Sequence, residues 1–178
     1  EAAVTARHTL AWLAASLAAL MLGACASDPN QGYSFQSTYP ENVHSVSVPI
    51  FDNYTFDTGV ETELTDAIIK ELQRSTDLRV VQGGNAESQL KGVVTKSELR
   101  RLSTQRGSGY VQEESVTLTI DFDWKDTRTG KVLTSRRQFA ASDTFVPVPN
   151  SGERIDTGRH GAVQRLARDI VSEMRESW

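Results

Sequence analysis

The sequence has 178 residues with a formal net charge of −4, and 24% of its residues are charged. Because nucleic-acid-binding domains carry a basic field, this balance argues against that class, although it allows a local basic patch. The chain contains one cysteine, which excludes an internal disulfide. A core of apolar side chains must therefore hold the fold, and a single domain is the simplest organisation for this length.

The N-terminus has the features of a lipoprotein signal peptide. A short basic stretch at residues 7–8 precedes an apolar run from Leu10 to Leu22. This run fits a signal-peptide core but is shorter than the ~20 residues of a membrane span. It leads into Leu22-Gly23-Ala24-Cys25, which resembles the lipobox that lipoprotein signal peptidase recognises. We therefore expect residues 1–24 to be a signal peptide and Cys25 to be the lipid-anchored N-terminus, with a diacylglycerol on its thiol and an N-acyl chain.

The segment after Cys25 begins with a polar tether and two short strands. Small and turn-forming residues dominate 25–31, which we expect to link the lipid to one domain over residues 32–178. Alternating aromatic and polar residues predict a strand over residues 33–38. A second strand is predicted over residues 44–51, with its apolar side chains on one face: Val46, Val48 and Ile50.

A helix is predicted next, because apolar residues recur at every fourth position and form one stripe: Val60, Leu64, Ile68 and Leu72. The residues at the start of the stripe match a capping box, in which the Thr58 hydroxyl and the Glu61 carboxylate would satisfy free backbone N–H groups. The helix is therefore expected to begin just after Thr58.

Four strands and a second helix are predicted in the rest of the chain. The clearest strand covers residues 116–125, where apolar residues alternate with polar ones so that one face is buried and one is wet. The hairpin loop after it contains Gly130, at a position typical of positive φ. The other predicted strands cover residues 78–81, 90–102 and 132–141, and a loop over 143–158 precedes a helix with the stripe Val163, Leu166, Ile170 and Met174.

The order of these elements predicts an α+β fold. Each helix has one apolar stripe and the strands have one wet face, so the helices should cover only one side of the sheet. We expect a two-layer sandwich with a mixed, mostly antiparallel sheet and both helices packed on one face.

No pattern in the sequence predicts an enzyme or a metal site. Asp-Thr-Gly occurs at residues 57–59 and 156–158 and resembles the catalytic pair of aspartic proteases, in which two carboxylates share a proton. Each copy is followed by helical periodicity, so both threonines are better interpreted as helix N-caps. His44 and His160 are far apart with no cysteine to join them, and no carboxylates have the spacing of a calcium loop.

Basic residues cluster on the strand over residues 90–102 and just after it. Their side chains suit phosphate groups, although solvated strand charges are the alternative interpretation. The cluster consists of Lys91, Lys96, Arg100, Arg101 and Arg106. On the neighbouring strand, Asp121 and Asp123 share a face. We expect a solvated charge ladder across the hairpin, with Arg136 and Arg137 as their partners.

Several stretches of the chain resemble the LptE family of lipopolysaccharide-assembly lipoproteins. The matching stretches follow one another over most of residues 32–178: Gly32-Tyr33-Ser34-Phe35, residues 46–56, residues 61–67, Leu90-Lys91-Gly92, the alternating strand from Val116, and residues 126–133. The resemblance implies a non-enzymatic subunit without a cofactor, held by its lipid on the inner leaflet of the outer membrane.

The resemblance also implies partners for the domain. In that family the domain plugs the β-barrel of the lipopolysaccharide translocon, helps the barrel to fold and contacts lipopolysaccharide. We therefore expect an LptD-like outer-membrane barrel and lipopolysaccharide as partners, and the basic cluster would meet the phosphates of the lipid.

A second class of lipoprotein is an alternative. Residues 49–55, the helix after them and residues 78–81 also resemble periplasmic domains of the CsgG and LpoB kind, which build secretion pores or activate peptidoglycan synthases. The long hairpin after Leu90 and the Gly-Tyr-Ser-Phe strand near the cysteine favour the LptE family. Ala26 follows the cysteine where an aspartate would favour retention in the inner membrane, so sorting to the outer membrane is expected.

Overall fold

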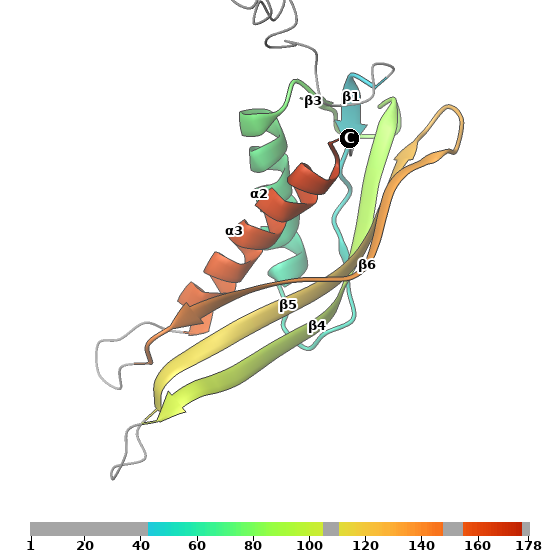
Figure 1. Ribbon diagram of the computed structural model, residues 1–178. Helices are drawn as coiled ribbons and strands as arrows, with labels where there is room; N and C mark the ends of the chain where they lie inside the picture. The colour runs from blue at the N-terminus through green and yellow to red at the C-terminus, as the bar shows by residue number, and fades with distance from the viewer. Residues whose placement is uncertain (1–42, 105–110, 148–154, 176–178) are drawn as a thin grey trace, which may run out of the picture. The chain divides into compact units, whose positions relative to one another are not determined.

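A computed structural model describes residues 43–104, 111–147 and 155–175 (Figure 1). The expected signal peptide, Cys25, the tether and the strand over residues 33–38 lie outside these ranges, as does Arg106. The described elements follow in the order β1 (Ser45–Ser47), β2 (Asp52–Asn53), α2 (Val60–Ser75), β3 (Arg79–Val80), β4 (Ser88–Thr104), β5 (Val111–Asp126), β6 (Val132–Phe145) and α3 (Ile155–Glu173).

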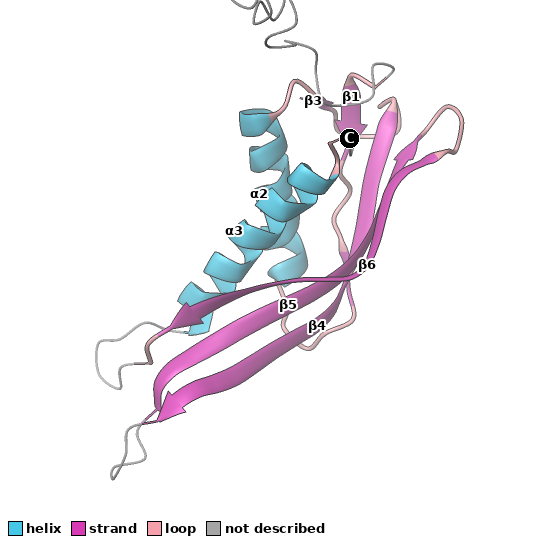
Figure 2. Cartoon of the chain, in the orientation of Figure 1, coloured by secondary structure: helices cyan, strands magenta, loops and turns pink. Residues whose placement is uncertain are grey.

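The described elements form two layers, one of strands and one of helices (Figure 2). The strands make one mixed sheet in the order β3-β1-β4-β5-β6, and the short β2 also pairs with β4. The long strands β4, β5 and β6 are antiparallel, whereas β1, β2 and β3 pair in parallel. The helices α2 and α3 lie on one side of the sheet. The predicted α+β sandwich is therefore confirmed.

The core lies between the helices and one face of the sheet. On β5 the alternating residues of the buried face are at most 3% exposed: Val116, Leu118, Ile120, Phe122 and Trp124. The predicted apolar stripes of the two helices are buried as well. They consist of Val60, Leu64, Ile68 and Leu72 on α2 and of Val163, Leu166, Ile170 and Met174 along and just after α3. The Trp124 indole N–H donates to Ser88 Oγ at 3.0 Å, so its one polar group is satisfied inside the core.

The start of α2 corrects the predicted capping box. The N-cap is Gly59, in a left-handed conformation with φ 91°, and as a glycine it has no side chain to accept from the first backbone N–H groups of the helix. The predicted role of Glu61 is confirmed, because its carboxylate oxygens accept from the Gly59 N–H at 3.1 and 3.2 Å. The predicted role of Thr58 is wrong, since a glycine takes the left-handed turn more easily than a threonine does.

The second helix also starts differently from the prediction. Asp156, Thr157 and Gly158 lie inside α3, so Thr157 does not precede the helix as an N-cap. Gly158 is buried beneath Phe145, and a Cβ at Gly158 would lie 2.5 Å from that ring, so the absence of a side chain lets the helix approach β6 closely. Neither α2 nor α3 is long and apolar enough to cross a membrane.

The segment after β1 departs from the predicted alternation. Val46 is fully buried, but the strand ends at Ser47, before Pro49. Ile50 is 66% exposed, and Phe51 is 2% exposed instead. Proline lacks an N–H and disrupts a strand ladder, so the chain changes phase there. The Phe51 ring packs over Gly92 on β4, where a Cβ would lie 2.3 Å from the ring.

Candidate interaction surface

Three of the predicted basic residues lie on the face of the sheet that the helices leave open. Lys91 lies opposite Asp123, Lys96 opposite Thr119, and Arg100 opposite Ser115. Residues that face each other across two strands point to the same side. These β5 residues alternate with the apolar core residues of the strand. Lys91, Lys96 and Arg100 therefore share the open face, and we call them the cationic row.

Arg101 does not belong to the cationic row. It lies opposite Glu114, next to Ser115 on β5, and therefore on the helix side of the sheet. Its Nε is 3.8 Å from Glu114 Oε1, and because the Arg101 side chain is largely exposed this ion pair is weak. The predicted cluster is therefore divided between two faces, because residues that are adjacent along a strand point in opposite directions.

The charges of the cationic row are largely unpaired. Within the described ranges, Lys91 and Lys96 form no ion pair, and Arg100 Nη2 is 3.5 Å from Glu98 Oε2. Both side chains of the latter pair are exposed, so the interaction contributes little and is easily exchanged. Along β4 the row extends roughly 30 Å, given the ~3.3 Å rise per residue. Ammonium and guanidinium groups spaced in this way suit a ligand with several separated anionic groups.

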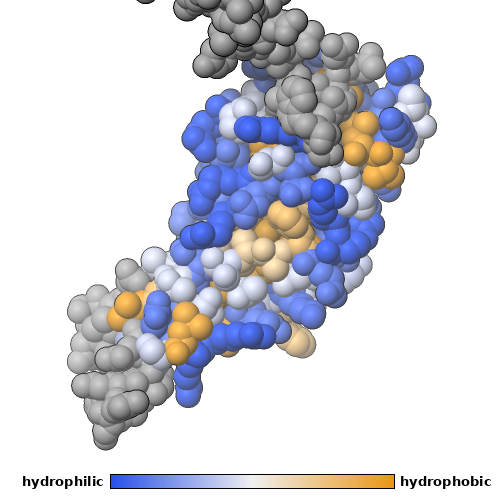
Figure 3. All heavy atoms as spheres, in the orientation of Figure 1, coloured by the Kyte–Doolittle hydropathy of each residue, from blue (hydrophilic) through white to orange (hydrophobic). Residues whose placement is uncertain are grey.

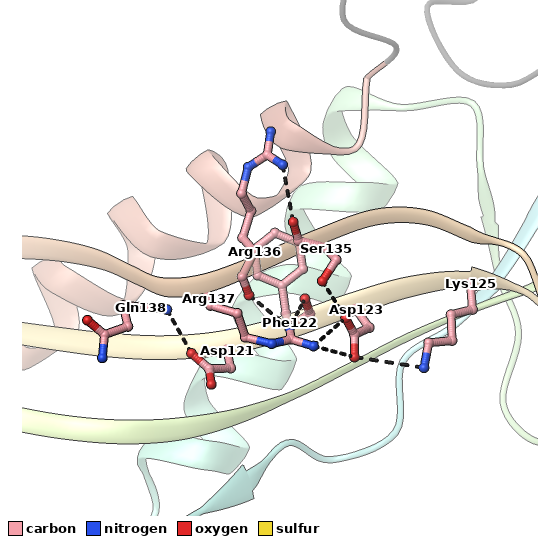
Figure 4. A network of polar contacts seen from close by, with 8 residues as sticks. All are labelled: Asp121, Phe122, Asp123, Lys125, Ser135, Arg136, Arg137 and Gln138. Atoms are coloured by element: carbon pink, nitrogen blue, oxygen red, sulfur yellow. Dashed lines mark hydrogen bonds and ion pairs between the residues drawn. The ribbon is translucent and has the colours of Figure 1, made fainter.

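The Asp123 carboxylate, opposite Lys91, interacts with side chains other than Lys91 (Figure 4). Ser135 Oγ donates to Asp123 Oδ1 at 2.6 Å, and Arg137 Nη2 donates to both Asp123 oxygens, at 2.9 and 3.1 Å. The Ser135 hydrogen bond lowers the pKa of the Asp123 carboxyl despite partial burial, and Arg137 and Lys125 lower it further. Asp123 therefore stays ionised without help from Lys91.

A β-bulge on β6 positions this network. The ladder between β5 and β6 shifts register between Ile120 and Phe122, where two residues, Arg137 and Gln138, lie opposite Asp121 alone. Gln138 has φ 52°, the only positive φ among the described residues other than glycine, and its N–H donates to Asp121 Oδ1 at 2.7 Å. Arg137 Nη1 donates to the Phe122 carbonyl at 3.1 Å. The bulge therefore brings the Arg137 guanidinium into contact with Phe122 and Asp123 on β5. The sequence pattern did not predict this contact geometry.

The predicted charge ladder is partly confirmed. Arg137 pairs with Asp123 as expected. Arg136 is not a partner of either aspartate, because it lies opposite buried Phe122 and so points to the helix side. There its Nη2 is 2.6 Å from Glu173 Oε2 on α3.

The two Asp-Thr-Gly sequences do not adopt the matched loops of an aspartic protease. The Asp57 carboxylate accepts a hydrogen bond from the Ser97 hydroxyl, while Asp156 lies in α3 and pairs with Arg159 at 2.7 Å. A cavity of about 240 Å³ on the helix side is lined by Asp57, residues 97–99, Val116, Ile155 and Arg159. In the three described ranges, no group of three or more His, Cys, Asp or Glu side chains could hold a metal ion.

Exposed apolar side chains are scattered over the described surface. On the face shown in Figure 3, apolar atoms gather in separate patches among hydrophilic ones. Tyr54 and Phe56, between β2 and α2, are exposed, as are Leu99 and Leu102 on β4. Leu99 is 49% exposed although its partner Val116 is buried, and it lines a cavity together with Ile155 and Arg159 of α3.

The described domain has two layers and an open, charged sheet face. Comparison with known families specifies it further. The family model for LptE, lipopolysaccharide-assembly, matches residues 43–175. The chain therefore belongs to the LptE family of lipoproteins, which is non-enzymatic and has no cofactor.

Solved structures share the fold with little sequence identity. The chain is similar to a protein from Xanthomonas campestris, with a TM-score of 0.51, 12% identity and coverage of 74% of this chain and 86% of that one. It is similar to an uncharacterized lipoprotein B from Nitrosomonas europaea, with a TM-score of 0.50, 16% identity and coverage of 80% and 92%. A hypothetical protein from Chlamydia trachomatis gives a TM-score of 0.50, 13% identity and coverage of 73% and 94%. No curated protein matches the sequence.

Proposed function

We propose that this chain is the lipoprotein subunit of an outer-membrane lipopolysaccharide translocon, anchored through Cys25 to the periplasmic side of the outer membrane. In this role it plugs an LptD-like β-barrel, helps the barrel to assemble and contacts lipopolysaccharide without catalysing a reaction. Membership of the LptE family supports the role. The observation that carries the lipid contact is the cationic row, whose charges point away from the helices and are largely unpaired.

The phosphates of lipopolysaccharide are the proposed ligands of Lys91, Lys96 and Arg100. Phosphate oxygens form charge-assisted hydrogen bonds with ammonium and guanidinium groups, and several such contacts along one strand would act together. Arg101 is directed to the other face, and we give it a smaller share of the binding. Arg106 follows β4 in the sequence and stays a candidate for the same contact.

A charge-reversal experiment tests this lipid contact. Changing Lys91, Lys96 and Arg100 to glutamate in the full chain should weaken lipopolysaccharide binding at least about tenfold, because three attractive contacts become repulsive. The matched control reverses three exposed cations on the helices, Lys70, Arg74 and Arg168, which changes the net charge equally. Equal loss of binding in both variants, or no loss in the first, would contradict the assignment of this face.

The anchor is tested separately at Cys25. Cys25→Ala removes the thiol that would carry the diacylglycerol, so the protein should fold but remain unprocessed and lose its outer-membrane location. Metabolic labelling with a radioactive fatty acid, together with membrane fractionation, measures both effects. Normal lipid labelling of Cys25→Ala would remove the anchor from the proposal.

A further inference from the structure

Two exposed aromatic side chains lie between β2 and α2. Tyr54 is 77% exposed, and Phe56 is fully exposed. By contrast, Phe51, Phe122 and Trp124 are at most 2% exposed. Aromatic rings carry a large apolar area, so two exposed rings that are two residues apart concentrate apolar surface at one place.

The loop that carries the two rings is fixed by its own polar groups. The Thr55 N–H and hydroxyl both donate to Asn53 Oδ1, at 2.8 and 2.7 Å. Asn53 Nδ2 donates to the Asp57 carbonyl at 2.8 Å and to Glu61 Oε2 at 2.7 Å. The Asp57 carboxylate accepts from the Ser97 hydroxyl on β4. The loop is therefore joined to both α2 and β4, so a ligand of the rings has little backbone left to order.

The pairing of β2 with β4 directs Tyr54 to the open side of the sheet. Asn53 pairs with Val94, whose partner Ile120 on β5 is buried, so Asn53 lies on the helix side. The Tyr54 N–H donates to the Val94 carbonyl at 2.9 Å, which continues the pairing by one residue. Because side chains alternate along a strand, Tyr54 is directed to the opposite side from Asn53. It therefore borders the cationic row, in which Lys96 follows Val94 by two residues.

Asp52 determines which part of an anionic lipid suits this loop. Asp52 is exposed and pairs with Val93, which lies opposite Asp121 on the open side. A carboxylate at this position repels a phosphate above β2 but has no such effect on an uncharged hydrocarbon chain. The charges therefore keep the phosphates on β4 and leave the loop to the apolar part of the lipid.

We propose that Tyr54 and Phe56 bind an acyl chain of the same lipid molecule whose phosphates contact the cationic row. The ligand is an amphiphile, and this side of the domain supplies cations for its phosphates and aromatic rings for its hydrocarbon. Covering the rings removes apolar surface from water, and the phosphate contacts orient the lipid. This inference rests on the lipid contact proposed above and adds an acyl subsite to it.

Two probes separate the acyl subsite from the phosphate contacts. They are intact lipopolysaccharide and the phosphorylated saccharide that remains after its acyl chains are removed. In the full chain, Tyr54→Ser together with Phe56→Ser should weaken binding of intact lipopolysaccharide about tenfold or more and change binding of the saccharide by less than about twofold. Reversing the charges of the cationic row should weaken binding of both probes. Dissociation constants measured with the immobilised protein give these ratios.

The matched control replaces two exposed apolar side chains on the opposite edge of the sheet with serine. These are Val132 at the start of β6 and Val146 just after its end. The control variant should bind both probes as the wild type does. Circular dichroism spectra and melting temperatures establish that the fold of each variant is unchanged. Phosphatidylcholine vesicles without lipopolysaccharide are a third probe, to which the aromatic variant should bind as the wild type does.

The outcomes distinguish this inference from the proposed function. If the aromatic variant binds intact lipopolysaccharide normally while charge reversal weakens it, the acyl subsite is wrong and the phosphate contact stands. If charge reversal weakens neither probe, the proposed lipid contact itself fails. Equal losses of the aromatic variant for both probes overturn the acyl subsite. Weaker binding of that variant to plain vesicles also overturns it, because the rings would then contact the bilayer.

Discussion

The two faces of the sheet are built from alternate residues of the same strands, yet they differ in almost every property. On the helix side, β5 presents a continuous apolar row that is closed off by α2 and α3. On the open side, the same strand presents Thr117, Thr119, Asp121 and Asp123, all partly exposed. A substitution one residue further along the strand therefore passes from the core to the surface that we propose for binding. Stability and function occupy separate faces of one strand.

The largest effect that tests this comparison is expected in the core. Phe122→Ala should reduce the free energy of unfolding by about 3–5 kcal/mol, because the ring is 1% exposed and packs edge-on against Phe139 at 5.6 Å. Thr119→Ala, on the open face of the same strand, should cost less than about 1 kcal/mol. Chemical denaturation measures both. Similar losses for the two variants would contradict the division between the faces.

Gly92→Ala tests the close contact between the Phe51 ring and β4. Gly92→Ala places a Cβ 2.3 Å from the Phe51 ring and 2.7 Å from the Asp121 carbonyl oxygen, which belongs to the backbone and cannot move aside. We expect a loss of about 1–3 kcal/mol in thermal or denaturant unfolding. Gly84→Ala is the control, because nothing lies within 4 Å of its Cβ position. If Gly92→Ala is as stable as the control, Phe51 does not pack as described.

The bulge on β6 should be more stable with glycine. Gln138 has φ 52°, which is unfavourable for a residue with a Cβ. Gln138→Gly should therefore raise the free energy of unfolding by about 0.5–1 kcal/mol, and Gln138→Ala should give no gain. Equal effects of glycine and alanine would show that the backbone angle stores no strain.

The smallest effect concerns the loss of folding stability at low pH. The pKa of Asp123 is lower in the folded protein than the ordinary value of about 3.9 in an unfolded chain. Its stabilising contribution is therefore fully present above about pH 4 and is lost as the pH falls through the lower folded-state pKa. Asp123→Asn should flatten the dependence of the unfolding free energy on pH below 4. An unchanged slope would exclude Asp123 from the linkage.

Sequence periodicity predicted the parts of the fold that depend on burial. The stripes of both helices and the alternation on β5 are determined by which side chains avoid water, and they occur as predicted. Prediction was less successful where backbone geometry decides, as at Gly59, at Pro49 and at the bulge of Gln138. No apolar period marks such positions, because their conformation follows from local φ and ψ and from contacts distant in sequence.

The candidate surface shows the same division. The cluster of basic residues was apparent from composition along β4, but its separation into the cationic row and Arg101 depends on the register with β5, including the shift after Val94. Arg136 and Arg137 were both expected beside the aspartates, and the bulge directs only Arg137 there. The sequence shows where charged residues cluster along a strand. The face of the sheet on which each charge lies can be determined only when the pairing of the strands is known.

The most direct test of the proposed role is recovery of the tagged full-length protein from its native membrane in gentle detergent, with mass spectrometry of what accompanies it. The account predicts a large outer-membrane β-barrel in near-equal amount. A peptidoglycan synthase in that place, or no outer-membrane barrel at all, would contradict it.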